Sequence, residues 1–187
     1  MAEAWRGAAD RDWSVPAGTL EWSCATTAAH AVDAVLAPAF FLASRRQVDY
    51  PGGGWTPPPD GGPDDFAEGV ETATRILTAV VRDTPPDVRA IIWRRPGPEL
   101  RPPGDFVPRG GIELVLHAHD VCAGLGVPFA PPAAVIDRLR HHVSDRPYWT
   151  AGPPWSPLSL EGDPWQDLLR SAGRRSDDGR HGDVATT

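Results

Sequence analysis

The sequence predicts an all-α protein, a four-helix bundle with long loops and short extra helices near its C-terminus. Apolar residues recur in several segments at the three- and four-residue spacing of amphipathic helices. The 22 prolines and 19 glycines must lie mostly in long loops between these segments, because both residue types interrupt regular structure. We therefore expect one helical domain over residues 1–173, followed by a polar, disordered tail over residues 174–187.

The first half of this domain begins with a short helix over residues 2–11, which Trp13 and Pro16 end. Ser23 and Thr26 are each plausible N-caps for a long helix that runs to about Arg46. Pro38 lies inside this helix and predicts a kink or a break, because proline has no backbone N–H to donate.

Residues 48–64 are so rich in proline and glycine that we expect an irregular loop, a candidate lid or wall for a pocket. Asp64 or Asp65 then caps a helix over residues 66–82, which is apolar on one side. A short extended piece is expected at residues 90–93, within a second long loop.

Three further helices are expected after that loop. The first begins around residues 108–111 and ends near Gly124 or Gly126, since glycine suits a helix C-terminus. Pro131 and Pro132 open the next helix, AAVIDRLRHHV. Asp163 caps a short final helix, DPWQDLLRSAG.

Composition excludes several classes of protein. The net charge is −7, and all 18 basic residues are arginines with no basic run, which argues against nucleic-acid or anionic-membrane binding. Neither a signal peptide nor an apolar run of membrane-spanning length is apparent, so we expect a cytoplasmic protein with no membrane partner. The two cysteines, Cys24 and Cys122, form no C-x-x-C pair and require no oxidising compartment.

A histidine and a glutamate with helical spacing provide the main functional signal. Glu113 and His117 lie four residues apart in GGIELVLHAHDVCAGLG, so their side chains share one face of a helix. His30 lies in the other strongly apolar helix, beside the small residues Ala34 and Ala37. Together the three side chains would make a three-ligand divalent-metal site with one position open for water or substrate.

Alternative interpretations of the same residues remain open. Glu113, His117 and Asp120 form one stripe, which is the solvent face if the helix lies at the surface. The doublet His119-Asp120 is also the signature of the HD-domain phosphohydrolases, with His30 and Asp137 as further ligands.

Other reactive residues carry weaker signals. Cys24, near a helix start, is a candidate nucleophile, although a buried thiol is the commoner case. Trp55 and Trp93 are candidates for the mouth of a pocket. A group of arginines precedes the second histidine helix and is suited either to an anionic substrate or to ordinary solvation: Arg94, Arg95, Arg101 and Arg109.

Two segments resemble a known family. DWSVPAGTLEWSCATTAAHAVDAV and GGIELVLHAHDVCAGLG resemble, in the same order, the two metal-binding blocks of the DinB-like, mycothiol-dependent maleylpyruvate isomerases. The resemblance covers residues 12–46 and 105–128. It implies a DinB-like bundle in which His30, Glu113 and His117 bind a divalent ion, usually zinc.

The resemblance also implies a chemistry. A metal-activated thiol, that of mycothiol, or water would attack a small electrophilic metabolite, in a thiol transfer or an isomerisation. Asp33, Asp120 and His119 are candidates for orienting the ligand imidazoles. A hydrolase that uses metal-bound water and a non-catalytic metal-binding or stress-response bundle are the alternatives.

Overall fold

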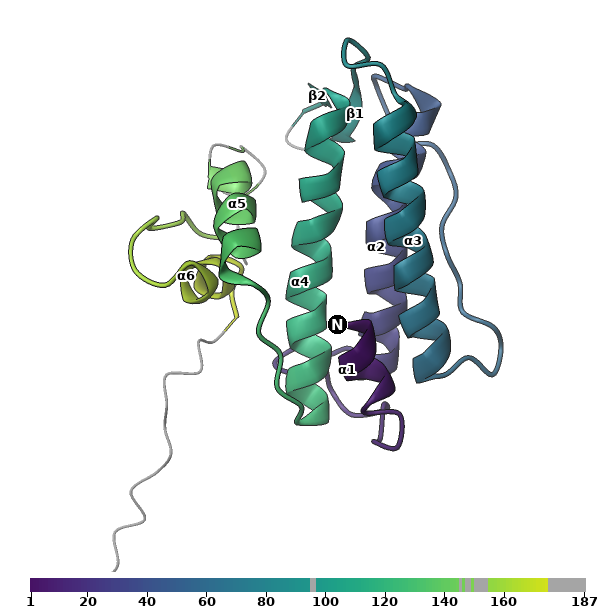
Figure 1. Ribbon diagram of the computed structural model, residues 1–187, viewed down its shortest axis with the longest axis vertical. Helices are drawn as coiled ribbons and strands as arrows, with labels where there is room; N and C mark the ends of the chain where they lie inside the picture. The colour runs from purple at the N-terminus through teal and green to yellow at the C-terminus, as the bar shows by residue number, and fades with distance from the viewer. Residues whose placement is uncertain (95–96, 145, 147–148, 150–154, 175–187) are drawn as a thin grey trace, which may run out of the picture.

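The computed structural model describes residues 1–94, 97–144, 146, 149 and 155–174. Most of these residues are helical, as predicted. Three long helices, α2 (Cys24–Ser44), α3 (Pro63–Asp83) and α4 (Phe106–Leu125), lie side by side (Figure 1). The short helix α1 (Ala2–Arg6) contacts α3 near one end of this layer.

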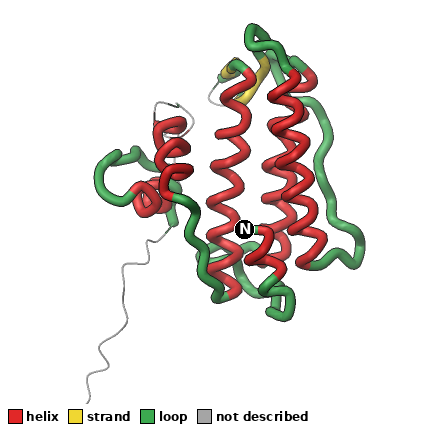
Figure 2. Tube along the Cα trace, viewed as in Figure 1, coloured by secondary structure: helices red, strands yellow, loops and turns green. Residues whose placement is uncertain are grey.

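A small antiparallel hairpin lies at the other end of the three long helices (Figure 2). Its first strand, β1 (Ala90–Trp93), is the predicted extended piece, and its three apolar residues Ala90–Ile92 are buried. The partner strand β2 (Glu99–Arg101) was not expected from the sequence. It alternates partly buried and exposed residues and is only three residues long, so it carries little pattern of its own.

Helix α2 begins as predicted, but its interior differs from the expectation. Ser23 is the N-cap, and its side-chain oxygen accepts from the backbone N–H of Thr26 at 3.1 Å, so Thr26 is not the cap. The helix ends at Ser44, and Pro38 does not break it. Pro38 cannot donate to the carbonyl of Ala34, and both residues line the same cavity, described below.

Two other helix boundaries also differ from the predictions. Helix α1 ends at Arg6 and not near residue 11, because residues 7–10 form turns. Helix α3 begins at Pro63 with Gly62 as its N-cap residue. Asp65 therefore lies inside the first turn, where its carboxylate accepts from the backbone N–H of Gly62 at 2.8 Å.

Helix α4 starts at Phe106, ahead of the predicted start at residues 108–111, because it follows directly on a turn of 3-10 helix, η1 (Pro103–Asp105). It ends at Leu125, and Gly126 is its C-cap with a left-handed φ of 67°. Its apolar residues divide between two hydrophobic clusters. Phe106, Val121 and Leu125 join the cluster of α1, α2, α3 and β1, whereas Ile112 and Leu116 join a second cluster. α4 therefore lies between the two clusters, which accounts for the apolar residues on several of its sides.

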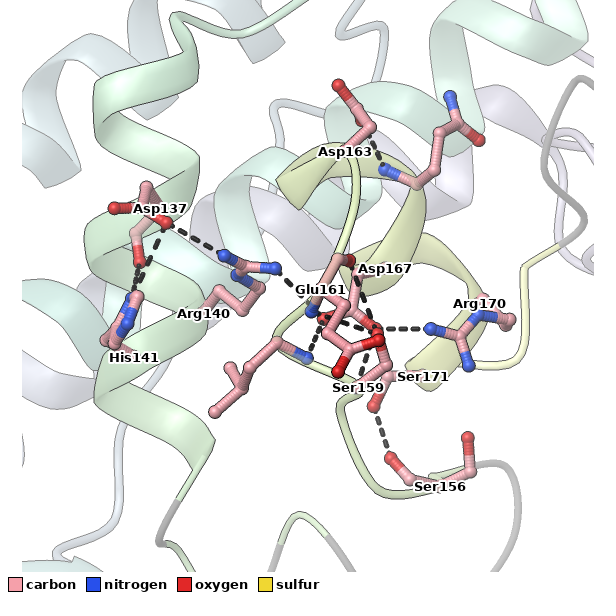
Figure 3. A network of polar contacts seen from close by, with 12 residues as sticks. Asp137, Arg140, His141, Ser156, Ser159, Glu161, Asp163, Asp167, Arg170 and Ser171 are labelled. Carbon is pink, nitrogen blue, oxygen red and sulfur yellow. Dashed lines mark hydrogen bonds and ion pairs between the residues drawn. The ribbon is translucent and has the colours of Figure 1, made fainter.

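The second cluster belongs to α5 (Ala133–Ser144) and α6 (Pro164–Ser171), which pack together beside α4 (Figure 1). Asp163 caps α6 as predicted, accepting from the backbone N–H of Gln166 at 2.8 Å. The buried carboxylate of Asp167 accepts from the backbone N–H groups of Ser159 and Leu160 at 2.9 and 3.0 Å, and it also binds Arg140 of α5 (Figure 3). This network ties α5, α6 and the loop between them into one unit.

The fold is thus mostly helical, but the four-helix bundle around one core remains a prediction. The described core residues form two clusters on opposite sides of α4, with α5 in the second. The residues of the predicted tail lie outside the described residues, except for Arg174, which is fixed against α4.

One described helix, α2, is long and apolar enough to cross a membrane, with a mean hydropathy of 1.4 over its most apolar window. Half of that window is buried within the protein, as in the core helix of many globular proteins. The finding is weak evidence for a membrane span.

Candidate metal centre

The three predicted metal ligands come together between α2 and α4. His30 lies on α2, and Glu113 and His117 lie one helical turn apart on the facing side of α4. One potential ligand atom from each of them lies within 4.8 Å of those of the other two. The stripe of Glu113, His117 and Asp120 is therefore not a solvent face: His117 and Asp120 are buried, and Glu113 is only partly exposed.

His117 presents its two ring nitrogens to two different carboxylates. Nε2 lies 3.4 Å from Glu113 Oε2, and Nδ1 lies 3.3 Å from Asp120 Oδ2. In a tetrahedral zinc site with bonds near 2.1 Å, neighbouring ligand atoms are about 3.4 Å apart. The Nε2–Oε2 pair therefore already has the spacing of two zinc ligands, while Asp120 faces the nitrogen on the far side of the ring.

The charges around His117 favour its protonated form while no metal is bound. Burial alone would lower the pKa of His117, but Asp120 and Glu113 outweigh burial and raise it above the usual value. The pKa of Asp120 is lowered despite burial, because His117 and Arg174 both stabilise the carboxylate. Arg174 Nη2 lies 2.7 Å from Asp120 Oδ2, and Arg174 Nε lies 3.2 Å from Oδ1.

Glu113 is held as a carboxylate from both of its oxygens. Arg109 donates to Oε1, and His117 lies beside Oε2. Burial would raise the pKa of Glu113, but these two cations outweigh burial and hold it far below its usual range. The guanidinium of Arg109 also lies over the ring of Trp93, 4.4 Å from its centroid, which keeps Arg109 in place.

The ring of His30 favours its uncharged form, unlike that of His117. Burial and the neighbouring His117 lower its pKa, so its ring favours the uncharged form that binds metal ions. Its ring centroid lies 4.9 Å from that of His117 and 5.2 Å from that of Trp22, each in an edge-to-face arrangement. A neutral imidazole, a carboxylate and a second imidazole together form a donor set that fits Zn²⁺.

A cavity of about 380 Å³ opens directly onto this centre. His30 and Glu113 lie in its wall, so a metal ion held by the three ligands would be accessible from the cavity. The remaining wall combines small and aromatic residues with two arginines; it contains Asp33, Ala34, Ala37, Pro38, Phe41, Tyr50, Trp93, Arg94 and Arg109. Its size suits a small metabolite or part of a larger one.

Of the three residues expected to orient the imidazoles, one faces a ligand and two contact other groups. Asp120 faces the Nδ1 atom of His117. Asp33 does not contact a ligand through any described hydrogen bond; its Oδ1 accepts from the backbone N–H of Trp55 at 2.8 Å and thereby ties the loop of residues 48–64 to α2. His119 points to the other side of α4, where its ring packs against Trp165 at a centroid distance of 5.5 Å.

The position of His119 also argues against the HD-type site. Successive residues of a helix project about 100° apart, so His119 and His117 cannot serve one centre on α4. Asp137, the further ligand in that interpretation, is partly exposed on α5, where it pairs with Arg140 at 3.0 Å.

Some of the arginines and tryptophans that the sequence suggests for a pocket line this cavity, and others lie elsewhere. Arg94, Arg109 and Trp93 line the cavity. Arg101 instead pairs with Glu99 on β2. Trp55 borders a separate cavity between α2 and α3, and Arg95 lies outside the described residues.

The cysteines are not placed for catalysis. Both thiols are free and buried. Burial raises the pKa of Cys24, and it raises that of Cys122 to about 11. Both thiols therefore remain protonated near neutral pH, which removes the nucleophilic thiolate.

Arg174 contacts Asp120, although the sequence predicts a polar tail from this residue onward. The signal that points to it is the glycine before it: Gly173 has a φ of 73°, a left-handed conformation that ends a helix and turns the chain. That turn directs Arg174 back onto α4 and Asp120.

No family model, curated protein or solved structure matches this chain.

Proposed function

We propose that this protein binds a divalent metal ion, most simply Zn²⁺, through His30, Glu113 and His117, and that it works on a small electrophilic metabolite with a low-molecular-weight thiol. The observation that carries the proposal is that the three ligand atoms gather within 4.8 Å at the wall of a cavity. In finer detail, we propose a DinB-like bundle and mycothiol as the thiol.

The opposing proposal is a buried charge network without a metal. His117, its two carboxylates and the two arginines would satisfy one another in such a network. That network gives no role to His30, whose ring lies beside His117 and whose lowered pKa favours the neutral form. A neutral imidazole at this place is useful to a metal ion and contributes no charge to the network.

A bound Zn²⁺ supplies Lewis acidity that lowers the pKa of a coordinated thiol or water towards neutrality. The chain provides the surroundings for this chemistry. Arg109 holds Glu113 in one orientation, and Ala34, Ala37 and Phe41 form an apolar part of the cavity wall. Arg94, in the same wall, pairs with Asp49 at 3.3 Å and lies over the ring of Tyr50, and an anionic group of the substrate would compete with Asp49 for it.

The compartment follows from the same chemistry. Both cysteines are free, and a thiol co-substrate must remain reduced, so we propose that the protein acts in the cytoplasm.

Calorimetric titration of the zinc-loaded protein with mycothiol tests the proposal. We expect saturable binding with proton release, because a thiol loses its proton on coordination. Neither effect should appear with the metal-free protein. Absence of thiol binding, together with hydrolysis of ester or phosphate substrates by the loaded protein, would instead assign the centre to metal-bound water. Absence of both would leave a non-catalytic metal-binding protein.

A further inference from the structure

A series of side chains with alternating charge connects Arg174 to the proposed metal site. The series runs from Arg174 to Asp120 and from Asp120 to His117 Nδ1, with distances of 2.7 Å and 3.3 Å. The other nitrogen of His117, Nε2, faces Glu113. Arg174 therefore contacts the group that faces the back of a metal ligand, although it lies outside α4.

We propose that Arg174 is a positioning residue for the metal centre, which fixes Asp120 and thereby the orientation of the His117 ring. The inference rests on the proposed function, since it assumes that His117 Nε2 binds the metal. It extends that function because Arg174, which lies three positions after α6, makes the α5–α6 unit part of the centre.

The geometry of Arg174 supports this role more than it supports a general surface ion pair. Its side chain is only 10% exposed and that of Asp120 only 2%. Arg174 uses two nitrogens on the two oxygens of Asp120, a planar contact that sets the orientation of a carboxylate. A third nitrogen donates to the carbonyl of Ala172 at 2.9 Å and fixes the guanidinium itself.

The orientation of Asp120 matters because it selects which nitrogen of His117 keeps its proton when the ring is neutral and binds a metal ion. A carboxylate that faces Nδ1 keeps the hydrogen on that nitrogen and leaves the lone pair of Nε2 directed towards Glu113 and His30. The distance of 3.3 Å places Nδ1 and the carboxylate in contact without a well-formed hydrogen bond in the described structure. The ring thus depends on a carboxylate that is itself held in place.

Arg170 provides a matched control. It lies on α6 one turn before Arg174 and also pairs with a buried aspartate, Asp167, but its side chain is 56% exposed and its partner belongs to the α5–α6 network (Figure 3). Loss of Arg170 should therefore affect the α5–α6 unit without affecting His117. A difference between Arg170 and Arg174 variants separates positioning of the metal ligand from stabilisation of α6.

The test compares the wild-type protein with Arg174→Met, Arg174→Lys and Arg170→Met. Zinc affinity is measured by competition with a chelator, and folding is checked by circular dichroism and thermal unfolding. We expect Arg174→Met to bind zinc about 10- to 100-fold more weakly, the usual effect of losing a group that supports a metal ligand. Arg174→Lys should show a smaller loss because it keeps the charge without the two-pronged contact, and Arg170→Met should show none. The visible absorption of bound Co²⁺ should also change in Arg174→Met, since it reports ligand geometry.

A second measurement separates this inference from the proposed function. Nitrogen-15 NMR of histidine-labelled, metal-free protein, recorded at a pH high enough for His117 to be neutral, reports which ring nitrogen keeps its proton, and we expect Arg174→Met to change the two ring-nitrogen shifts of His117. Unchanged zinc affinity in Arg174→Met overturns the inference and leaves the proposed function intact. If the wild-type protein binds no zinc, the proposed function fails, and unchanged His117 nitrogen shifts in Arg174→Met then overturn the positioning role as well.

Discussion

The ring of His30 on α2 and the ring of His117 on α4 lie 4.9 Å apart at an interplanar angle of 80°. Two histidines from distant parts of the sequence thus meet at one point, together with Glu113. His119, two residues beyond His117, packs instead against Trp165. The contrast between His117 and its neighbour gives the first prediction.

Replacing His117 by glutamine should remove tight zinc binding, because the site loses one of its three ligands. Replacing His119 by glutamine should leave zinc binding unchanged, since its ring lies on the other side of α4. Zinc affinity, measured by chelator competition on both variants, distinguishes the proposed site from the HD-type site. Equal losses in the two variants would support the HD-type site.

Zinc affinity should increase with pH through the raised pKa of His117. Histidine has an ordinary pKa of about 6.5, and that of His117 is higher, so zinc must displace a proton from this ring over a range that extends above that value. Displacement of one proton weakens binding by up to about tenfold per pH unit on the acid side. Titrations between about pH 6 and pH 8 check the trend; an affinity that does not change over this range would contradict it.

The metal-free protein should show the opposite dependence. Because the folded pKa of His117 exceeds the unfolded value, its contribution to stability is fully present below about pH 6.5 and is lost as the pH rises through the folded pKa. The unfolding free energy of the wild type should therefore exceed that of His117→Gln most at acid pH. Urea unfolding without metal measures this difference, and a difference that grows with pH would be inconsistent with the assignment.

Asp33 and Asp120 should have separable roles. Asp33→Ala removes the acceptor for the Trp55 N–H, which should cost about 1 kcal/mol and increase hydrogen exchange in residues 51–62. Zinc affinity should not change in this variant. In contrast, Asp120→Ala should weaken zinc binding about 10- to 100-fold. Weaker zinc binding in Asp33→Ala would show that Asp33 also supports the metal ligands.

Neither cysteine should react in the folded protein. Both are buried with raised pKa values, so iodoacetamide at neutral pH should modify Cys24 and Cys122 only after unfolding. Intact mass spectrometry before and after addition of denaturant measures this directly. Rapid modification of one thiol in the folded protein would instead support that cysteine as a nucleophile.

The sequence predicts the local features of the centre better than its wider surroundings. The four-residue spacing of Glu113 and His117 determines that they share a helix face, and the apolar surroundings of α4 indicate that this face is buried. The approach of His30 depends on how α2 packs against α4, which the helical pattern favours but does not determine.

The residues around the ligands depend on tertiary contacts that leave no local pattern. Asp33 and Asp120 occupy similar positions, three residues after a histidine, yet one binds the backbone of Trp55 and the other faces His117. Arg174 reaches Asp120 only because the α5–α6 unit packs on α4. The short strand β2 exists because β1 provides a pairing edge. Trp55 lies 22 residues from Asp33 in the sequence, and Arg174 lies 54 residues from Asp120.

The metal content of the purified protein tests the central claim most directly. Elemental analysis after incubation with zinc and removal of free metal should give about one ion per chain for the wild type and for Glu68→Ala, a control at an exposed acid on α3. Glu113→Ala should retain almost none. A wild-type protein that holds no metal, or a Glu113→Ala variant that holds as much as the wild type, would contradict the account.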